Sequence, residues 1–323
     1  MHLELRHLRI LKAVADHGSL TRAAAALGIS QPTLTKQVQR IEEELGAPVF
    51  LRGRQGAQPT EFGAFVLARI KAVLTNIDEI LAYRPHRGDL GNVRFGGTMP
   101  PWIGGVVDWL ADLDSATSVT VHAERAIGTQ VEMVVARRMD LSLVADYPGH
   151  VLEPQPELVC RTIAVEPVFI ALCTSHPLAQ QEEVDLNDLE DEIWVIPHSD
   201  GMGWPEHLHD ACAAAGFYPN NRYPLFDTGL RRELVATGRA VTACQATVRA
   251  DENVAVRPIR GNPLWMRHLM LWRRDSAIAA YGDDLVRVAQ QAHQAAVDNS
   301  PAYHAWVQRY GQSPAESELF HSS

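Results

Sequence analysis

Five polar side chains between residues 31 and 40 have the spacing of one helix face. Gln31, Thr35 and Gln39 are four residues apart, and so are Lys36 and Arg40. Residues four apart are neighbours on a helix surface. Glutamine can form two hydrogen bonds with adenine, lysine can donate to guanine, and threonine offers a hydroxyl or a methyl group. These side chains could therefore read base edges, and Lys36 and Arg40 also suit contacts with phosphates.

The other side of the same segment is apolar. Its residues recur at i, i+4, i+7 and i+11, and they are Leu34, Val38, Ile41 and Leu45. This period predicts one buried helix face over residues 31–45. Ser30 can cap the helix, Pro32 fits its first turn because a missing N–H costs nothing there, and Gly46 ends it. The buried stripe leaves the polar face free.

Two further helices are expected before this one, at 5–17 and 20–27. Gly18 separates them, Ser19 can cap the second, and Gly28 follows it where a left-handed backbone is common. Two helices this close to each other indicate a helix-turn-helix, in which the first supports the second and the second lies in the DNA major groove. The alternative is a pair of ordinary amphipathic helices whose polar face is only solvated.

The segment PVFLRGRQGAQPT at 48–60 predicts a short hairpin or wing, in which Arg52 and Arg54 suit phosphate contacts. Residues 1–60 carry 8 Lys+Arg against 5 Asp+Glu, a charge of +3. The remaining residues carry 21 against 34, a charge of −13. This split predicts a small basic module on an acidic body that repels DNA, so one end of the molecule should meet it.

Thr60 can cap a long helix at 61–84, which at 1.5 Å per residue would be ~36 Å long. Its apolar positions are Phe62, Phe65, Val66, Ile70, Val73, Ile77, Ile80 and Leu81. Such a stripe needs a partner, and self-association is the favoured expectation. Packing on the C-terminal body is the alternative.

Composition and length set further bounds. The 323 residues are 46% hydrophobic and 21% charged, which predicts about two globular domains. Apolar runs are far shorter than the ~20 residues of a membrane helix, and no signal-peptide pattern is present, so a cytoplasmic protein is expected. The four cysteines lack metal or disulfide spacing and are expected to be buried thiols, with a redox sensor as the alternative.

Residues 84–91, RPHRGDLG, are expected to be a linker. Beyond it strands and helices alternate, which predicts an α/β body with mostly parallel sheets. The expected strands are 92–98, 118–124, 140–145, 167–173, 192–197, 222–227, 240–244 and 266–273. The expected helices are 101–113, 128–138, 204–215, 229–238, 278–298 and a further one at 301–311.

The sequence GSLTRAAAALGISQPTLTKQVQRIEEELGAPVFLR, followed by PTEFG, resembles the N-terminal signature of LysR-type transcriptional regulators. A looser resemblance extends to about residue 298 and includes HPLA at 176–179, DLNDLEDEIWVIP, ELVATGRAVT at 233–242 and LMLWRRD at 269–275. The resemblance implies an α+β multidomain chain: a winged helix-turn-helix, a dimerising linker helix, and an α/β effector domain of periplasmic-binding-protein type with two subdomains.

The implied domain boundaries are 1–60 for the DNA-binding domain, 61–84 for the linker helix, 91–300 for the effector domain and 301–323 for a C-terminal extension. Within the effector domain, subdomain I comprises 91–163 and 269–300, and subdomain II comprises 164–268.

In that family the residues at Gln31, Pro32, Thr35 and Lys36 approach the DNA. This chain has Thr35-Lys36 where Ser-Arg is commoner, and Leu51 where an acidic residue usually precedes the wing arginine. Lysine lacks the two-pronged guanidinium of arginine, so the base preference at this position is left open. The expected DNA contacts are Ser30, Gln31, Pro32, Thr35, Lys36, Gln39, Arg40, Arg52 and Arg54.

The resemblance also implies a small-molecule effector in a cleft between the subdomains, near helix N-termini and strand ends. The expected lining residues are Thr98, Met99, Pro100, Thr129, Ser199, Asp200, Gly201, Met202 and Thr228. Thr129 and Thr228 are also expected to be helix N-caps. Asp200 and Asp227 disfavour an anion directly beside them.

An enzyme is less favoured by the sequence. His207 and His209 in HLHD are two residues apart, so they point to different faces of the expected helix. H-E-x-x-H and G-x-S-x-G are missing, and the glycine pairs lack phosphate-loop spacing. No catalytic residue, no metal and no cofactor other than the effector is expected.

The sequence therefore predicts a DNA-binding transcriptional regulator, bound as a homodimer or homotetramer to an inverted-repeat promoter site. The effector would shift the population between open and closed clefts. RNA polymerase is a candidate partner, and no membrane partner is expected. The alternative is a ligand-binding or enzymatic α/β protein whose N-terminal helices serve dimerisation alone.

Overall fold

The computed structural model describes residues 3–53, 56–82, 90–98, 100–113, 117–123, 126–153, 155–201, 203–311, 314 and 319–320. Most of the expected linker, together with Arg54, Met99 and Met202, lies outside these residues. The chain divides into two compact units, Met1–Pro85 and His86–Ser323, and each is described by itself.

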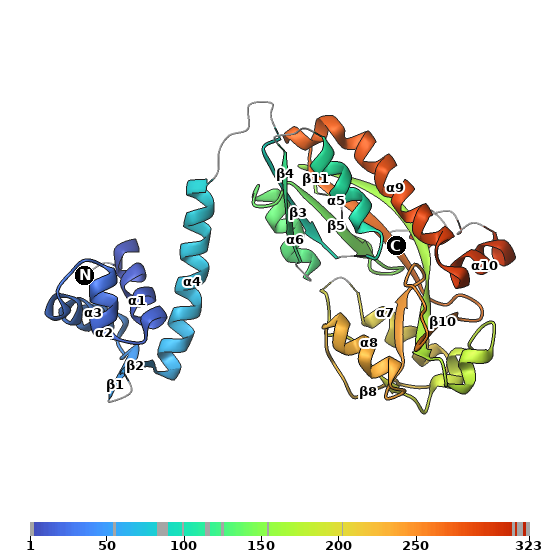
Figure 1. Cartoon of the computed structure of the whole chain (residues 1–323), viewed down its shortest axis with the longest axis horizontal. Helices are drawn as coiled ribbons and strands as arrows, with labels where there is room; N and C mark the ends of the chain where they lie inside the picture. Colours follow the sequence, from blue (N-terminus) through green and yellow to red (C-terminus); the bar gives the residue numbers. More distant parts are fainter. Residues whose placement is uncertain are drawn as a thin grey trace. The chain divides into compact units, whose positions relative to one another are not determined.

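The first unit is a helical domain with a short hairpin (Figure 1). Its elements are α1 (Leu5–His17), α2 (Leu20–Ala26), α3 (Gln31–Leu45), β1 (Phe50–Gly53), β2 (Gly56–Pro59) and α4 (Glu61–Ala82). The strands β1 and β2 pair in antiparallel fashion, with Phe50 opposite Pro59. The three expected short helices, the hairpin and the long helix are thus confirmed within the described residues.

Local capping chemistry explains where these helices begin and end. The hydroxyl of Ser19 accepts a hydrogen bond from the Arg22 N–H at 3.5 Å, and that of Ser30 accepts one from the Thr33 N–H at 3.3 Å. Gly28 has a φ of +68° just after α2, a conformation that costs glycine little and other residues more. The chain can therefore turn from α2 into α3 within four residues.

The apolar stripe of α3 forms the centre of this unit. Leu34, Val38 and Ile41 are fully buried, and they pack with Leu11 and Val14 of α1 among other apolar residues. Burial of a side chain of this size contributes about 1.5–3 kcal/mol. Leu45, the expected fourth member of the stripe, lies at the end of α3 and is half-buried against the same cluster.

The second unit is built on a seven-stranded sheet in the order β10-β6-β11-β5-β3-β4, with β9 beside β6. Its strands are β3 (Asn92–Gly97), β4 (Ser118–His122), β5 (Leu141–Asp146), β6 (Leu158–Cys173), β9 (Thr242–Gln245), β10 (Val254–Pro258) and β11 (Trp265–Arg273). A small parallel pair is formed by β7 (Ile193–Trp194) and β8 (Asn220–Asn221).

Helices cover this sheet. They are α5 (Ile103–Asp112), α6 (Ile127–Val135), α7 (Glu206–Ala214), α8 (Thr228–Ala236), α9 (Gly282–Asp298) and α10 (Pro301–Tyr310). Within the described residues, short 3-10 turns lie at Pro177–Gln180, Leu186–Leu189 and Ala277–Tyr281. Figure 1 shows α5 and α9 side by side, and both pack on the core around Phe95, Leu143 and Trp272.

The expectation of mostly parallel sheets is wrong. Only β3–β4 and β3–β5 are parallel among the described strands of the large sheet, whereas β11–β5, β11–β6, β10–β6 and β6–β9 are antiparallel. The physical reason is the length of β6, which starts at Leu158 instead of the expected residue 167. It lies antiparallel to β11 along most of its length. An alternation of strands and helices in the sequence therefore does not show whether neighbouring strands pair in parallel or antiparallel fashion.

Two smaller differences concern single strands. The expected strand at 222–227 is wrong: these residues are not in a strand, and β8 lies just before them at Asn220–Asn221, because Pro224 has no N–H to give to a ladder. The strand β10 was not expected, since it is short and ends at Pro258.

Besides the core around Phe95, this unit has a second large core around Ile170, Trp194 and Leu208, and buried ionic groups lie where β6 and β11 pass between the two. Arg267 donates to both carboxylate oxygens of Asp146, at 2.9 and 2.5 Å, and the Leu152 N–H donates to the same carboxylate at 2.9 Å. The ring of Phe320 covers the Arg267 guanidinium, with 4.7 Å to the ring centroid. Phe320, near the C-terminal end, therefore lies beside Arg267 of β11.

A second buried group lies on the neighbouring strand residues. Glu166 is fully buried and lies 2.9 Å from His268 Nε2 and 3.0 Å from His293 Nε2. Burial disfavours the charged form, but both imidazoles outweigh it and lower the pKa of Glu166 from 4.5 to about 2. Trp102 packs edge-on against both histidine rings. These contacts tie β6, β11, α9 and the start of α5 together.

We predict that Asp146→Ala lowers the free energy of unfolding of the second unit by about 3–5 kcal/mol, because it leaves the buried Arg267 charge without its partner. Urea denaturation followed by circular dichroism measures the change. The control is Glu182→Ala, since its pair with Arg309 is exposed and should change stability by less than about 0.5 kcal/mol. Equal effects of the two substitutions would contradict this account.

Candidate nucleic-acid interface and effector region

The polar face of α3 is open to solvent in the chain. Gln31, Lys36, Gln39 and Arg40 are exposed, and Thr35 is half-buried beside the apolar stripe. The structure therefore brings the sequence-predicted side chains together on one face of one helix. Gln31 and Lys36 lie in its N-terminal half, which is the part that reaches base edges when such a helix enters the major groove.

The residues at the start of α3 have a structural task as well. Ser30 caps the helix, and its hydroxyl also lies 2.7 Å from the Thr33 hydroxyl. Pro32 is exposed at the second helical position. In the wing, Arg52 belongs to β1 opposite Ala57, and Arg54 lies outside the described residues.

A carboxylate that the sequence analysis missed fixes the wing to α3. Glu42 Oε1 accepts hydrogen bonds from the backbone N–H groups of Val49 at 2.9 Å and Phe50 at 3.1 Å. From the other strand, the Ala57 N–H donates to the Gly18 carbonyl at 3.0 Å. The wing is therefore held both to α3 and to the turn between α1 and α2.

The expected effector residues lie in four segments of the second unit: 98–100, Thr129 in α6, 199–202 and Thr228 in α8. Thr98 follows β3, and both its N–H, at 2.9 Å, and its hydroxyl, at 3.3 Å, donate to the Leu143 carbonyl. Pro100 is buried. The hydroxyl of Ser199 is exposed and accepts a hydrogen bond from the Gly201 N–H at 3.2 Å.

Asp200 connects the 199–201 loop to the start of α6 and to Tyr147. Its carbonyl accepts from the Ile127 N–H at the start of α6 at 3.2 Å, and its carboxylate accepts from the Trp204 N–H at 3.2 Å and the Tyr147 hydroxyl at 3.4 Å. Burial and the Asp200 carboxylate hold the pKa of Tyr147 well above its ordinary value of 10. The loop around Asp200 thus docks on α6 and on the end of β5.

The expectation that Thr129 and Thr228 are N-caps is wrong. Ala126 precedes α6 and Thr129 is its third residue, while Asp227 caps α8 by accepting from the Leu230 N–H at 2.6 Å. Both threonines are exposed. The reason is that each helix begins one or more residues earlier than the sequence pattern indicates.

The first histidine of HLHD is packed and hydrogen-bonded within the fold. His207 Nε2 accepts a hydrogen bond from the Trp265 N–H at 3.3 Å, and its ring stacks on Tyr147. Burial, followed by the nearby His150, lowers the pKa of His207 from 6.5 to about 4. Among the described residues, no group of three or more His, Cys, Asp or Glu is placed to hold a metal ion.

The four cysteines form no disulfide, but they are not all buried as expected. Cys160 is exposed, because it lies in the outer, early part of β6, whereas Cys212 is fully buried. Burial raises the pKa of the Cys212 thiol to about 12. In the described part of the chain, no helix is long and apolar enough to span a bilayer.

The first unit is a winged helix-turn-helix whose third helix, α3, has an open polar face. The second is an α/β domain with two large cores on either side of the β6–β11 pairing. These two units define a DNA-binding regulator with a sensor domain. Residues 5–64 match the family described as "Bacterial regulatory helix-turn-helix protein, lysR family", and residues 90–294 match the "LysR substrate binding domain". The chain belongs to the LysR family of transcriptional regulators, with a DNA-binding helix-turn-helix and an effector-binding domain.

Individual relatives agree with this assignment. The small neutral protease regulatory protein of Streptomyces coelicolor is 34% identical over 316 residues, which cover 96% of this chain and 93% of the relative. The transcriptional regulator BenM of Acinetobacter baylyi is 28% identical over 254 residues, covering 77% and 82%. The fold is similar to that of full-length CbnR complexed with its target DNA, with a TM-score of 0.63, 21% identity and coverage of 89% and 100%.

We predict that Glu42→Ala weakens DNA binding and lowers the free energy of unfolding of the first unit by about 1.5–3 kcal/mol, because two N–H groups are deprived of a charged acceptor. Fluorescence anisotropy and urea denaturation measure the two effects. Glu43→Ala is the control, since this neighbouring carboxylate is exposed and its removal changes the charge equally. An identical result for both variants would exclude the proposed anchor.

The depressed pKa of His207 predicts a decrease of stability in acid. Below pH 6.5 His207 is protonated in the unfolded chain, but in the folded chain it stays neutral until about pH 4. The free energy of unfolding therefore falls between pH 6.5 and pH 4, by up to about 3 kcal/mol. His207→Gln can still accept from the Trp265 N–H but does not titrate. Urea denaturation at pH 7 and pH 5 should therefore show a smaller decrease for His207→Gln than for the natural chain or His209→Gln.

Proposed function

We propose that α3 enters the major groove of promoter DNA and that its polar face makes the specific contacts. Gln31, Thr35, Lys36 and Gln39 would reach base edges, and Arg40, Arg52 and Arg54 would contact phosphates. Ser30 and Pro32 would bring the helix start close to the DNA backbone. The proposal rests on the exposure of this polar face, because the buried apolar stripe of α3 fixes which side of the helix points outward.

We further propose that the protein binds as a homodimer or a pair of dimers joined through α4. Along this helix Ile70 and Leu74 are buried in their own domain, but Phe65 is 60% and Val73 42% exposed. Large apolar side chains left open on a long helix favour a second copy as their cover. Two recognition helices would then contact half-sites of an inverted repeat about one turn (~34 Å) apart.

The effector is proposed to bind where the Asp200 loop meets the start of α6. Thr98, Pro100, Ser199, Gly201 and their neighbours Met99 and Met202 would line the site, with Thr129 and Thr228 at the rim. The bond between Ile127 and Asp200 supports this placement, because a ligand that changes it would alter how the loop docks on α6. Binding would shift the population between two cleft states, which requires different affinities for the two.

This proposal divides the effector domain into two subdomains. Subdomain I comprises residues 91–163 and 269–300, and subdomain II comprises residues 164–268. This division is supported by the pairing of β6 with β11, whose register shifts between His268 and Leu269. The segment 301–323 would then be an extension, whose described helix α10 packs against α9 and β10. We also propose that the protein acts in the cytoplasm, needs no cofactor besides the effector, catalyses no reaction and meets RNA polymerase at the promoter.

The test is an anisotropy titration with the DNA upstream of the protein's own gene, repeated at several salt concentrations. Lys36→Ala together with Arg52→Ala should weaken binding and flatten the dependence of log affinity on log salt concentration. The slope should decrease by about 0.9 for each phosphate that the variant does not neutralise. Lys12→Ala is the control, because Lys12 is exposed in the same domain but pairs with Asp16 on α1.

Unchanged affinity in the double variant would contradict the proposed interface. It would favour the alternative, a ligand-binding protein whose N-terminal helices serve dimerisation.

A further inference from the structure

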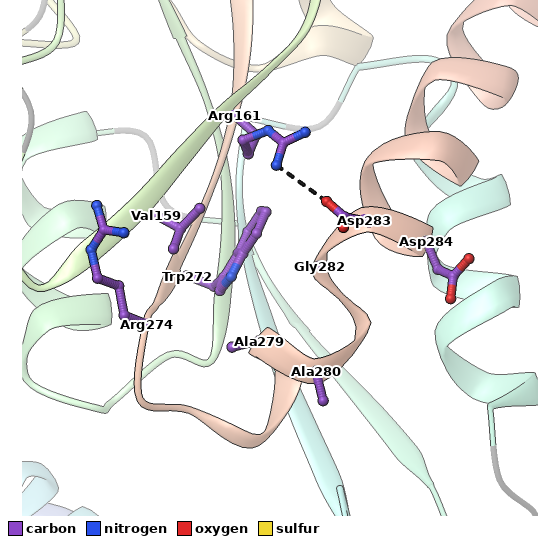
Figure 2. A pocket seen from close by; sticks show the side chains of 9 residues that line it. All are labelled: Val159, Arg161, Trp272, Arg274, Ala279, Ala280, Gly282, Asp283 and Asp284. Atoms are coloured by element: carbon purple, nitrogen blue, oxygen red, sulfur yellow. Dashed lines mark hydrogen bonds and ion pairs between the residues drawn. The ribbon is translucent and has the colours of Figure 1, made fainter.

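A pocket of about 540 Å³ lies in the second unit, away from the proposed effector region. Its volume is within the ordinary range for small-molecule sites. Figure 2 shows the Trp272 ring at its centre, with Arg274 and Val159 on one side and the start of α9 on the other. Ala279 and Ala280 add further apolar lining. None of the residues expected to bind the effector lines this pocket.

The ring of Trp272 is held in a fixed place. The residue is 3% exposed, and a Cβ on Gly282 would lie 2.7 Å from its Cζ2 atom. The start of α9 therefore approaches the indole so closely that glycine is required unless the ring moves. A ring packed this tightly presents its N–H in one defined direction.

This indole N–H has no hydrogen-bond acceptor among the described residues, and its nitrogen is not one of their fully buried unpaired polar atoms, so the N–H is accessible at the edge of an otherwise buried ring. An accessible N–H of this kind donates to water or to a bound molecule that reaches it. Trp272 lines the pocket, so a molecule inside it can supply the missing acceptor.

The charges around the pocket point to the sign of that molecule. Asp283 pairs with Arg161 at 3.2 Å, and Asp284 pairs with Arg287 at 2.8 Å. Arg274 donates to the Pro156 carbonyl at 3.1 Å, and no described carboxylate pairs with it. Among the lining residues, the two acids are thus matched and one guanidinium is left for an anion.

We propose that this pocket binds a small organic monocarboxylate with an apolar body. One carboxylate oxygen accepts from the Trp272 N–H and the group lies within reach of the Arg274 guanidinium, while the apolar body rests on Val159, Ala279 and the indole ring. This site is separate from the effector cleft, so the proposed function stands or falls independently of it.

The test uses the full-length chain labelled with 5-fluorotryptophan and observed by fluorine NMR. The seven tryptophans give separate signals, and Trp272→Phe identifies the one that matters. Phenylacetate is the probe, and neutral phenylacetamide and cationic phenethylamine have the same ring without the negative charge.

Phenylacetate should shift the Trp272 signal in a saturable manner, and the other two compounds should not. Arg274→Gln should raise the apparent Kd about tenfold, since it removes a charge-assisted contact. The control is Arg309→Gln, which also removes one positive charge, but on α10, where Arg309 pairs with Glu182. This variant should leave the Kd unchanged.

Three results would overturn the proposal: no shift of the Trp272 signal at millimolar phenylacetate, an unchanged Kd in Arg274→Gln, or equal binding of phenylacetamide. A shift confined to the Trp204 signal would place the probe in the effector region instead, because Trp204 packs on Tyr147 beside Asp200. That result would also reject the second site while leaving the proposed function intact.

Discussion

The burial of one apolar stripe on α3 is the interaction on which the DNA-binding domain depends. Leu34, Val38 and Ile41 fix the rotation of the helix about its axis, because all three are removed from water by α1, α2 and the wing. Once that rotation is fixed, the polar residues can only face outward. The wing takes its position from the same helix, through the Glu42 carboxylate.

The helix-turn-helix could be predicted from the sequence because its determinants are local. Ser19 and Ser30 cap helices by contacts three residues away, and Gly28 supplies a left-handed turn at the position where the pattern requires it. The role of Glu42 could not be predicted in this way, since its partners lie seven and eight residues further on across a turn. Its signal is an acidic residue next to the buried Ile41.

The effector domain was predicted less completely for the same reason. Arg267 and Asp146 are 121 residues apart in the sequence, and His293 and Glu166 are 127 apart, so no local pattern pairs them. The available signal was the presence of charged residues inside apolar strands, in AVEPVFIALC and WMRHLMLW. Buried charges require partners, and these partners lie where antiparallel β6 and β11 cross between the two cores.

The central claim is that the outward face of α3 is the part of the chain that DNA covers. The chain has three lysines, Lys12 on α1, Lys36 on α3 and Lys71 on α4. Brief acetylation followed by mass spectrometry, with and without the upstream DNA, measures the protection of each. We expect DNA to slow the acetylation of Lys36 strongly and that of Lys12 little. Equal acetylation of Lys36 in the free and DNA-bound protein would contradict the account.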